Sequence, residues 1–379
     1  MISLPAARRA GLAGVSLLRP MTLAVNGRNS WRRYHESAKV NAAAAAMAVP
    51  ITAQNQVFMP AMPTAPAATP VPALLNIKER SLDPEFYKAV SKIMEIRSKY
   101  VRDRFVFTEG AEMIPLLRAL GAADEDFSKL KKVSDLLEED PTLPFRKSTS
   151  GRFSFDPDTE TVRRLERQSF SLSVEEDFKR YDSGKIRYFD EIADELHFNT
   201  AFQALLVFKA ALIHGIQTTH RPMLAYEKNS WVCTMFNLRT ITTPNMVGEP
   251  ALEGVHTDGV DHTLTTFLGS NNMGGNSGVS FLHELAEETG TKVDDTKTLL
   301  LRGRAHHRHF LDTLVIVDHD LKHSISPVYA VDPTREATRD MFILFTRKPA
   351  NPEHISGSID SQKSYERLPM EIPMFVPGR

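Results

Sequence analysis

The feature that most constrains the fold of this chain is a series of short strand-like runs after residue 225. These runs alternate with turn sequences such as NMGGNSG, and they read SWVCTMFNLRTIT, HTLTTFLG, SGVSFLHEL, DTLVIVDH and RDMFILFTR. Several short strands at this spacing predict an antiparallel sandwich or barrel rather than a parallel sheet wound by helices.

The part before residue 220 has a helical pattern instead. Asp83 is a candidate N-cap and Pro84 stands at the first helical position, with apolar residues following at helical spacing. We expect a second helix over 110–121, and loops with at most short strands over 133–172. A third helical region, 187–214, is apolar nearly all round and should be buried.

Together these patterns predict an α+β protein. Its core is a double-stranded β-helix of the jelly-roll or cupin kind, with the N-terminal helices packed outside. We expect a single catalytic domain over 76–379, helical over 76–220 and with the β-helix core over 225–347.

Two segments precede this domain. Residues 1–35 carry six arginines and no acid, the composition of a mitochondrial-type leader, although a disordered cytosolic leader is the alternative. Residues 36–75 are rich in Ala and Pro and predict a disordered linker. The predicted location is therefore the mitochondrial matrix or the cytoplasm.

Composition excludes several classes of partner. The net charge of -1 provides no basic field for nucleic acid, and no run of eighteen apolar residues could span a membrane. The single cysteine, Cys233, rules out an internal disulfide. A chain of 379 residues with 42% hydrophobic content can bury one large core.

The stretch EGVHTDGVDH places His256 and Asp258 two residues apart. On a strand, side chains at this spacing point to the same face. His323 follows more than sixty residues later, after the apolar run DTLVIVD. Two histidines and one carboxylate in this order predict the facial triad that holds Fe(II) and leaves adjacent positions open.

Arg339 opens the next strand-like run. A guanidinium fork binds a carboxylate in a bidentate manner and stays charged when buried. We therefore predict that Arg339 binds the far carboxylate of 2-oxoglutarate.

Other histidines compete for the metal. His306, His307 and His309 lie among arginines without a nearby acid, so we expect a solvated or loop-lining role. His319 is an alternative to His323 as the distal ligand, and His262 is expected near the metal or in the core.

Residues from about 225 to 347 resemble the bacterial free-amino-acid dioxygenase family, which includes isoleucine 4-hydroxylase. The resemblance lies in GVHTDGVD, NNMGGNSG, DTLVIVDHDLKHSISPV and TRDMFILF, which follow one another in the family's order. It implies the double-stranded β-helix, Fe(II), 2-oxoglutarate and O2. It also implies His256, Asp258 and His323 as catalytic iron ligands and Arg339 as the 2-oxoglutarate anchor.

Within this family the chain is most similar to the fungal aziridine-forming valine oxygenases of 2-aminoisobutyrate biosynthesis. That similarity implies hydrogen abstraction at C3 of L-valine and closure to an aziridine-2-carboxylate in secondary metabolism. Hydroxylation of an aliphatic amino acid, free or peptide-bound, is the alternative. A non-catalytic cupin-like metal- or ligand-binding protein is the alternative of another class. The sequence does not determine the oligomeric state.

Strand alternation extends the prediction to the substrate. If Arg339 points into the barrel, then Ile343 and Phe345 share its face and become candidate pocket walls. Arg239 is the candidate for binding the substrate carboxylate, with a structural salt bridge as its alternative. Asp261 is a candidate for binding the ammonium group.

Overall fold

The computed structural model describes residues 74–176, 178–354 and 360–378. The expected leader and most of the expected linker lie outside these ranges. Leu75 belongs to the expected linker, but its side chain is buried and its N–H donates to Gln203 Oε1 at 2.7 Å. The domain therefore includes Leu75, because this apolar side chain has a place in the helical core.

The helices follow the predicted pattern, except that one expected helical region is divided. Asp83 caps the first helix by accepting from Glu85 N. The expected single region 187–214 instead contains a two-residue strand and two helices, because Asn199 accepts from Phe202 N and starts a new helix there. The helices are α1 (Pro84–Asp103), α2 (Gly110–Ala119), α3 (Asp124–Leu130), α4 (Asp194–His197) and α5 (Thr200–Ile213), with short 3-10 turns η1 (Ile77–Arg80), η2 (Val133–Leu136), η3 (Val174–Glu176), η4 (Val293–Asp295) and η5 (Thr298–Leu300).

The strands form two sheets. The larger sheet has the order β1 (Phe105–Thr108), β9 (Thr313–Val317), β6 (His262–Asn271), β11 (Ala337–Arg347), β5 (Trp231–Thr242), β2 (Arg146–Asp156), β3 (Thr161–Leu165) and β12 (Glu371–Pro373), with β4 (Asp190–Glu191) beside β2. The smaller sheet has the order β10 (Lys322–Ile325), β7 (Val279–His283) and β8 (Leu301–His306). Except for the parallel β2–β4 pair, the paired strands run antiparallel. This is the double-stranded β-helix that the sequence predicts, and the solved structures compared below share it.

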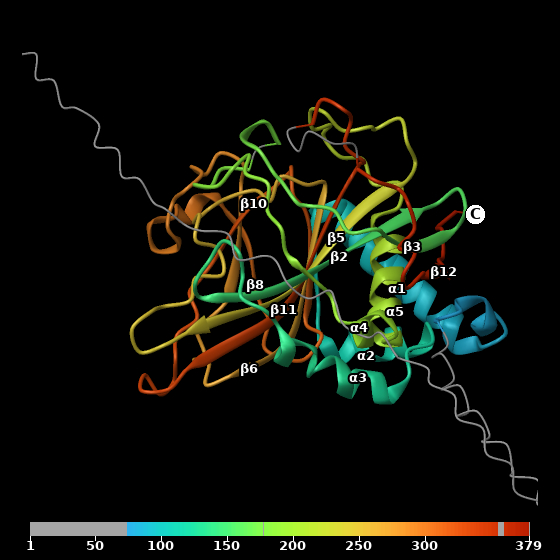
Figure 1. Cartoon of the computed structure of the whole chain (residues 1–379), viewed down its shortest axis with the longest axis horizontal. Helices are drawn as coiled ribbons and strands as arrows, with labels where there is room; N and C mark the ends of the chain where they lie inside the picture. The colour runs from blue at the N-terminus through green and yellow to red at the C-terminus, as the bar shows by residue number, and fades with distance from the viewer. Residues whose placement is uncertain (1–73, 177, 355–359, 379) are drawn as a thin grey trace, which may run out of the picture. The chain divides into compact units, whose positions relative to one another are not determined.

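Figure 1 shows the helices gathered on one side of the larger sheet, with β8 and β10 on the other. Strand β11 contributes side chains to both faces of the larger sheet, because successive side chains point in opposite directions. Phe342 and Leu344 join the core that contains α5, and Phe342 meets Phe202 edge-on at 5.5 Å. Ile343 and Phe345 pack instead against a separate aromatic cluster on the opposite face.

The expected boundary between a helical part and a β-helix core is wrong. Residues 133–172 were expected to be mainly loops, yet they contain β2 and β3, and β2 pairs with β5 over ten residues. The run RKSTSGRFSFD hides its alternation, because Phe153 and Phe155 are its only apolar side chains in the core, and the other buried positions carry serine, threonine, glycine or arginine. Strands β1 to β4 thus belong to the larger sheet although they precede residue 220.

Strand β8 was also not expected as a separate element, and β10 was expected only as a later strand that carries His323. Both are short and rich in charged or polar residues, so neither shows the apolar alternation of a half-buried strand. Among the described residues, no helix is long and apolar enough to cross a membrane.

Truncating side chains on the two faces of β11 should lower the free energy of unfolding by unequal amounts. We expect Phe342→Ala to lower the free energy of unfolding by about 3–5 kcal/mol, because the ring is fully buried between the sheet and α5. Phe345→Ala should cost clearly less, because the Phe345 ring already borders a cavity. Urea unfolding of both variants measures the difference, and equal losses would contradict this two-faced arrangement.

Candidate metal centre

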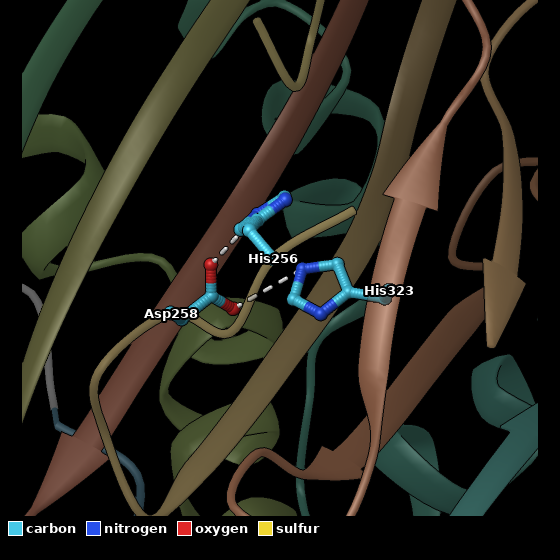
Figure 2. Close-up of side chains that lie close together, drawn as sticks. All are labelled: His256, Asp258 and His323. Atoms are coloured by element: carbon cyan, nitrogen blue, oxygen red, sulfur yellow. Dashed lines mark ion pairs between the residues drawn. The ribbon is translucent and has the colours of Figure 1, made fainter. Parts of the chain in front are cut away.

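Three side chains that the sequence analysis grouped come together in the structure. His256, Asp258 and His323 each offer one donor atom, and the three atoms lie within 4.8 Å of one another. Asp258 Oδ1 lies 3.4 Å from His256 Nε2, and Asp258 Oδ2 lies 3.5 Å from His323 Nε2. Figure 2 shows the carboxylate facing both imidazoles. All three residues are buried, so the cluster is shielded from bulk water.

Backbone hydrogen bonds bring the two histidines together. The N–H of His256 donates to the carbonyl of His323 at 2.9 Å, and the reverse bond has the same length. His323 lies on β10, as expected for a later strand. The prediction that His256 and Asp258 share a strand is wrong, because they lie in the loop before β6. Gly254 and Gly259 flank this loop with φ of 76° each and bend the chain out of strand geometry.

The charges in the cluster suit a cation. Burial raises the pKa of the Asp258 carboxyl, but the His323 and His256 imidazoles outweigh burial and hold the pKa well below its usual range. Burial lowers the pKa of His256, but Asp258 and Glu253 outweigh it and raise the pKa to about 9. His256 Nδ1 lies 2.8 Å from the Gly254 carbonyl, which fixes the ring with Nε2 towards Asp258.

Asp318 holds the loop that carries Asp258. Its carboxylate accepts from the backbone N–H of Asp258 at 2.8 Å and of Gly259 at 3.0 Å. Arg221 Nη2 donates to the same carboxylate at 2.8 Å, and both side chains are fully buried. Burial and the nearby Asp258 charge raise the pKa of Asp318 to about 6. The sequence analysis missed this residue, although an acid directly after an apolar strand was a visible signal.

Arg339 lies on β11 and is buried. Its Nη2 lies 3.5 Å from the Gly278 carbonyl, and its Nε has no hydrogen-bond partner in the described part of the chain. Burial lowers the pKa of Arg339 to about 10. No carboxylate among the described residues forms a salt bridge with it, so an anionic ligand would complete its contacts.

Gly278 has a specific steric role beside this arginine. A Cβ atom at position 278 would lie 2.5 Å from Arg339 Nε, and the φ of 62° also disfavours other residues. The sequence analysis treated this glycine only as part of a turn signal.

A cavity of about 790 Å³, open mouth included, borders the three donors. Ile343 and Phe345 line it, as strand alternation predicts, together with residues of β7, β9 and β10 such as Ser280, Leu314 and Ile325. Arg339 does not line it. Gly278, whose carbonyl faces Arg339, lies in the turn before β7, two residues before the cavity-lining Ser280. Arg339 is therefore near the cavity wall.

The two residues expected to bind the amino and carboxylate groups of the substrate face elsewhere. Arg239 donates to Asp340 at 2.7 and 2.8 Å and to Asp135 at 3.0 Å, outside the cavity. Its neighbours Phe236 and Leu238 take the cavity side of β5, so alternation turns Arg239 away. The structure therefore favours the structural salt bridge for Arg239.

Asp261 is likewise not available to a ligand. It is fully buried and accepts from Tyr226 Oη at 2.7 Å, from Thr218 Oγ1 at 3.0 Å and from Lys348 N at 3.2 Å. These contacts fasten the end of the metal-binding loop to its surroundings.

The competing histidines take other positions. His319 is not part of the donor cluster found among the described residues. His262 is buried and lies 2.9 Å from Tyr100 Oη through Nδ1. His309 is exposed, as one of the two expected roles requires. His307 lies in the loop after β8 and is buried against Phe107, 3.2 Å from Thr265 Oγ1, so of its two expected roles the solvated one is wrong.

The donor set fits iron. As for zinc, bonds from imidazole nitrogen or carboxylate oxygen to a metal are about 2.0–2.2 Å long, which puts ligands at right angles about 3 Å apart. The 3.4 and 3.5 Å separations are close to this value. Two histidines and one carboxylate form the set that binds non-haem Fe(II) with open positions. The unpartnered Arg339 Nε in turn fits a carboxylate co-substrate.

Comparison with known proteins agrees with this chemistry. Residues 131–345 match the family described as 2OG-Fe dioxygenase. The chain is 42% identical over 306 residues to the bifunctional enzyme flvA of Aspergillus flavus, which covers 81% of this chain and only 37% of the length of flvA.

Solved structures agree as well. The Fe(II)/α-ketoglutarate-dependent dioxygenase TqaL is 53% identical, with a TM-score of 0.68, covering 78% of this chain and 99% of that one. A bsmA homologue from Methylobium petroleophilum PM1 is 19% identical with a TM-score of 0.54, covering 68% of this chain and 93% of that one, and shares the fold alone.

The raised pKa of His256 predicts pH-dependent metal binding. Because the pKa is about 9, a metal must displace a proton from His256 at any lower pH. We expect the affinity for Mn(II), used as an air-stable substitute for Fe(II), to rise about tenfold per pH unit between pH 6 and pH 8. The paramagnetic resonance signal of free Mn(II) measures this, and a flat profile would show that His256 is already neutral.

The contacts of Asp318 predict a positioning role. We expect Asp318→Asn to weaken Mn(II) binding by about 10- to 100-fold, because the amide loses the charge that holds Arg221 and one acceptor for the loop. Asp320→Asn, on the exposed side of the same turn, is the matched control and should keep its affinity. Equal affinities for both variants would show that the loop holds its shape without Asp318.

Proposed function

The chain belongs to the 2OG-Fe dioxygenase family, and we propose that it oxidises a free aliphatic L-amino acid, with L-valine as the substrate. Family membership makes it a 2-oxoglutarate-dependent non-haem iron dioxygenase, an oxidoreductase. The alternative of a non-catalytic cupin-like binding protein is thereby set aside.

The family uses Fe(II), 2-oxoglutarate and O2, which together supply an oxidant that removes hydrogen from a substrate carbon while 2-oxoglutarate leaves as succinate and CO2. In the proposal, His256, Asp258 and His323 hold the iron. Arg339 grips the far carboxylate of 2-oxoglutarate, for which its buried and unpartnered Nε is suited.

The observation that carries the substrate proposal is the apolar wall beside the three donors. Ile343 and Phe345 project from β11 into the cavity and pack with Phe170 and Phe236. Phe345 lies 6.1 Å from the Phe170 ring, nearly parallel to it, and 5.7 Å from the Phe236 ring. Such a wall suits a branched aliphatic side chain and excludes water from it.

Two products can form once hydrogen has been removed from C3 of valine. Transfer of a hydroxyl to C3 gives 3-hydroxyvaline, with one oxygen atom of O2 in the product. Loss of a second hydrogen, from the amine, with N–C3 bond formation gives an aziridine-2-carboxylate, and that oxygen atom leaves as water. In the proposal Ile343 and Phe345 shield C3, which slows hydroxyl transfer and favours ring closure.

Incubation of the protein with L-valine, Fe(II), 2-oxoglutarate and O2 tests the proposal by mass spectrometry. We expect succinate and a product that lacks two hydrogens and has gained no oxygen. A product with one added oxygen would support the hydroxylase alternative. Turnover of no free amino acid would contradict the proposed substrate class.

The same assay on the Ile343→Ala, Phe345→Ala double variant tests the shielding role. We expect the hydroxylated product to increase relative to the aziridine. Phe342→Leu is the matched control, because Phe342 faces α5 on the same strand. An unchanged product ratio in the double variant would remove Ile343 and Phe345 from the control of the outcome.

A further inference from the structure

Three arginines line the cavity, and two of them already hold an aspartate. Arg146 donates to Asp140 through Nε at 2.8 Å and through Nη2 at 3.2 Å. Arg180 pairs with Asp182 through Nε and Nη2, the latter at 2.7 Å. The Arg146–Asp140 pair lies within residues 133–172, which were expected to be loops with at most short strands. The third arginine, Arg187, differs from them.

Arg187 is buried, with 7% of the residue exposed, and lines the same cavity. Its guanidinium lies 5.2 Å from the Phe170 ring centroid and 5.4 Å from that of Phe178, so two aromatic rings support it. Among the described residues, its Nε and Nη2 have no hydrogen-bond partner. Asp182 Oδ2 lies 3.9 Å from Nε, beyond hydrogen-bond distance, and that carboxylate is engaged by Arg180.

The two unbonded atoms of Arg187 form one edge of the guanidinium. This edge presents two parallel N–H groups, and Arg180 and Arg239 each use it to hold an aspartate. A buried charge without a hydrogen-bonded partner is costly, and here burial and the charge of Arg180 lower the pKa of Arg187 to about 10. A planar carboxylate from a ligand would supply both missing bonds.

A negative group lines the same cavity. Glu253 stands three residues before His256 in the metal-binding loop, and its side chain is 9% exposed. Its carboxylate lies 3.6 Å from Arg180 Nη1, and its charge also acts on the His256 imidazole. Arg187 keeps one guanidinium edge without hydrogen bonds among the described residues, and the ion pair of Glu253 with Arg180, at 3.6 Å, is too long for a hydrogen bond. The two side chains thus offer a cation and an anion that a zwitterion could join.

We propose that Arg187 binds the α-carboxylate and Glu253 the α-ammonium of a free amino acid. This inference rests on the proposed function and narrows it. A residue within a peptide has neither free group, so the site selects free amino acids. Arg187 and Glu253 take the roles that the sequence analysis predicted for Arg239 and Asp261.

Calorimetric binding to the full chain, loaded with Mn(II) and 2-oxoglutarate under argon so that no turnover occurs, tests the proposal. We expect the wild-type protein to bind L-valine and to bind L-valinamide on the order of 100-fold more weakly, because the amide leaves Arg187 unpaired. 2-Hydroxy-3-methylbutanoate, which lacks the ammonium group, should be weakened to a similar extent. This ligand series needs no variant and so does not depend on folding.

Variants then assign each preference to a residue. Arg187→Met should lose L-valine affinity and no longer distinguish it from L-valinamide, while Mn(II) and 2-oxoglutarate binding persist. Glu253→Gln should no longer distinguish L-valine from 2-hydroxy-3-methylbutanoate. Arg302→Met removes the same charge from a surface ion pair with Glu284 and serves as the matched control.

The outcomes separate this inference from the proposed function. Unchanged L-valine affinity in Arg187→Met and Glu253→Gln would overturn the inference and leave the substrate class standing. Equal affinity of the wild-type protein for L-valine and L-valinamide would also overturn it. Binding of no free amino acid by the wild-type protein would overturn both.

Discussion

The candidate metal centre depends on one pair of backbone hydrogen bonds. Where the loop before β6 crosses β10, His256 and His323 exchange N–H···O bonds of 2.9 Å each way. These bonds place the two imidazoles next to each other, with ring centroids 4.3 Å apart, and each faces one carboxylate oxygen of Asp258. Asp318 then holds the loop from the larger sheet through the backbone N–H of Asp258. Without the His256–His323 bonds, the loop that carries His256 and Asp258 would lose the backbone contact that holds it beside His323 on β10.

Strand β11 carries the residues that are proposed to contact the substrate and the co-substrate. Alternate side chains of this strand serve different purposes, so one strand supplies core packing, a cavity wall and a buried cation. Phe342 packs on α5, while Ile343 and Phe345 line the cavity. Arg339 reaches a glycine that leaves room for it. Few positions on this strand could change without affecting one of these roles.

Much of this arrangement could be predicted from local patterns. Apolar alternation revealed β5, β6, β9 and β11, and the order of His256, Asp258 and His323 indicated a shared metal. Strand β2 was missed because only Phe153 and Phe155, at its end, are apolar among its buried residues, while the others are serine, threonine, glycine and arginine and give no hydrophobic period. Arg239 was misplaced because its direction depends on which face of β5 meets the cavity. The role proposed for Arg187 could not be predicted. It rests on Nε and Nη2, which have no hydrogen-bond partner among the described residues, and only the packed structure reveals this.

The donors of the candidate metal centre are held by both sheets, one on a strand and the others in a loop, and this has a consequence for how the chain matures. His323 lies on the smaller sheet, whereas Asp258 is tied to the larger one through Asp318. The complete set cannot exist until both sheets have formed and docked. A metal ion would bind there only late in folding and would then link the two sheets. Metal binding should therefore slow unfolding more than it speeds folding.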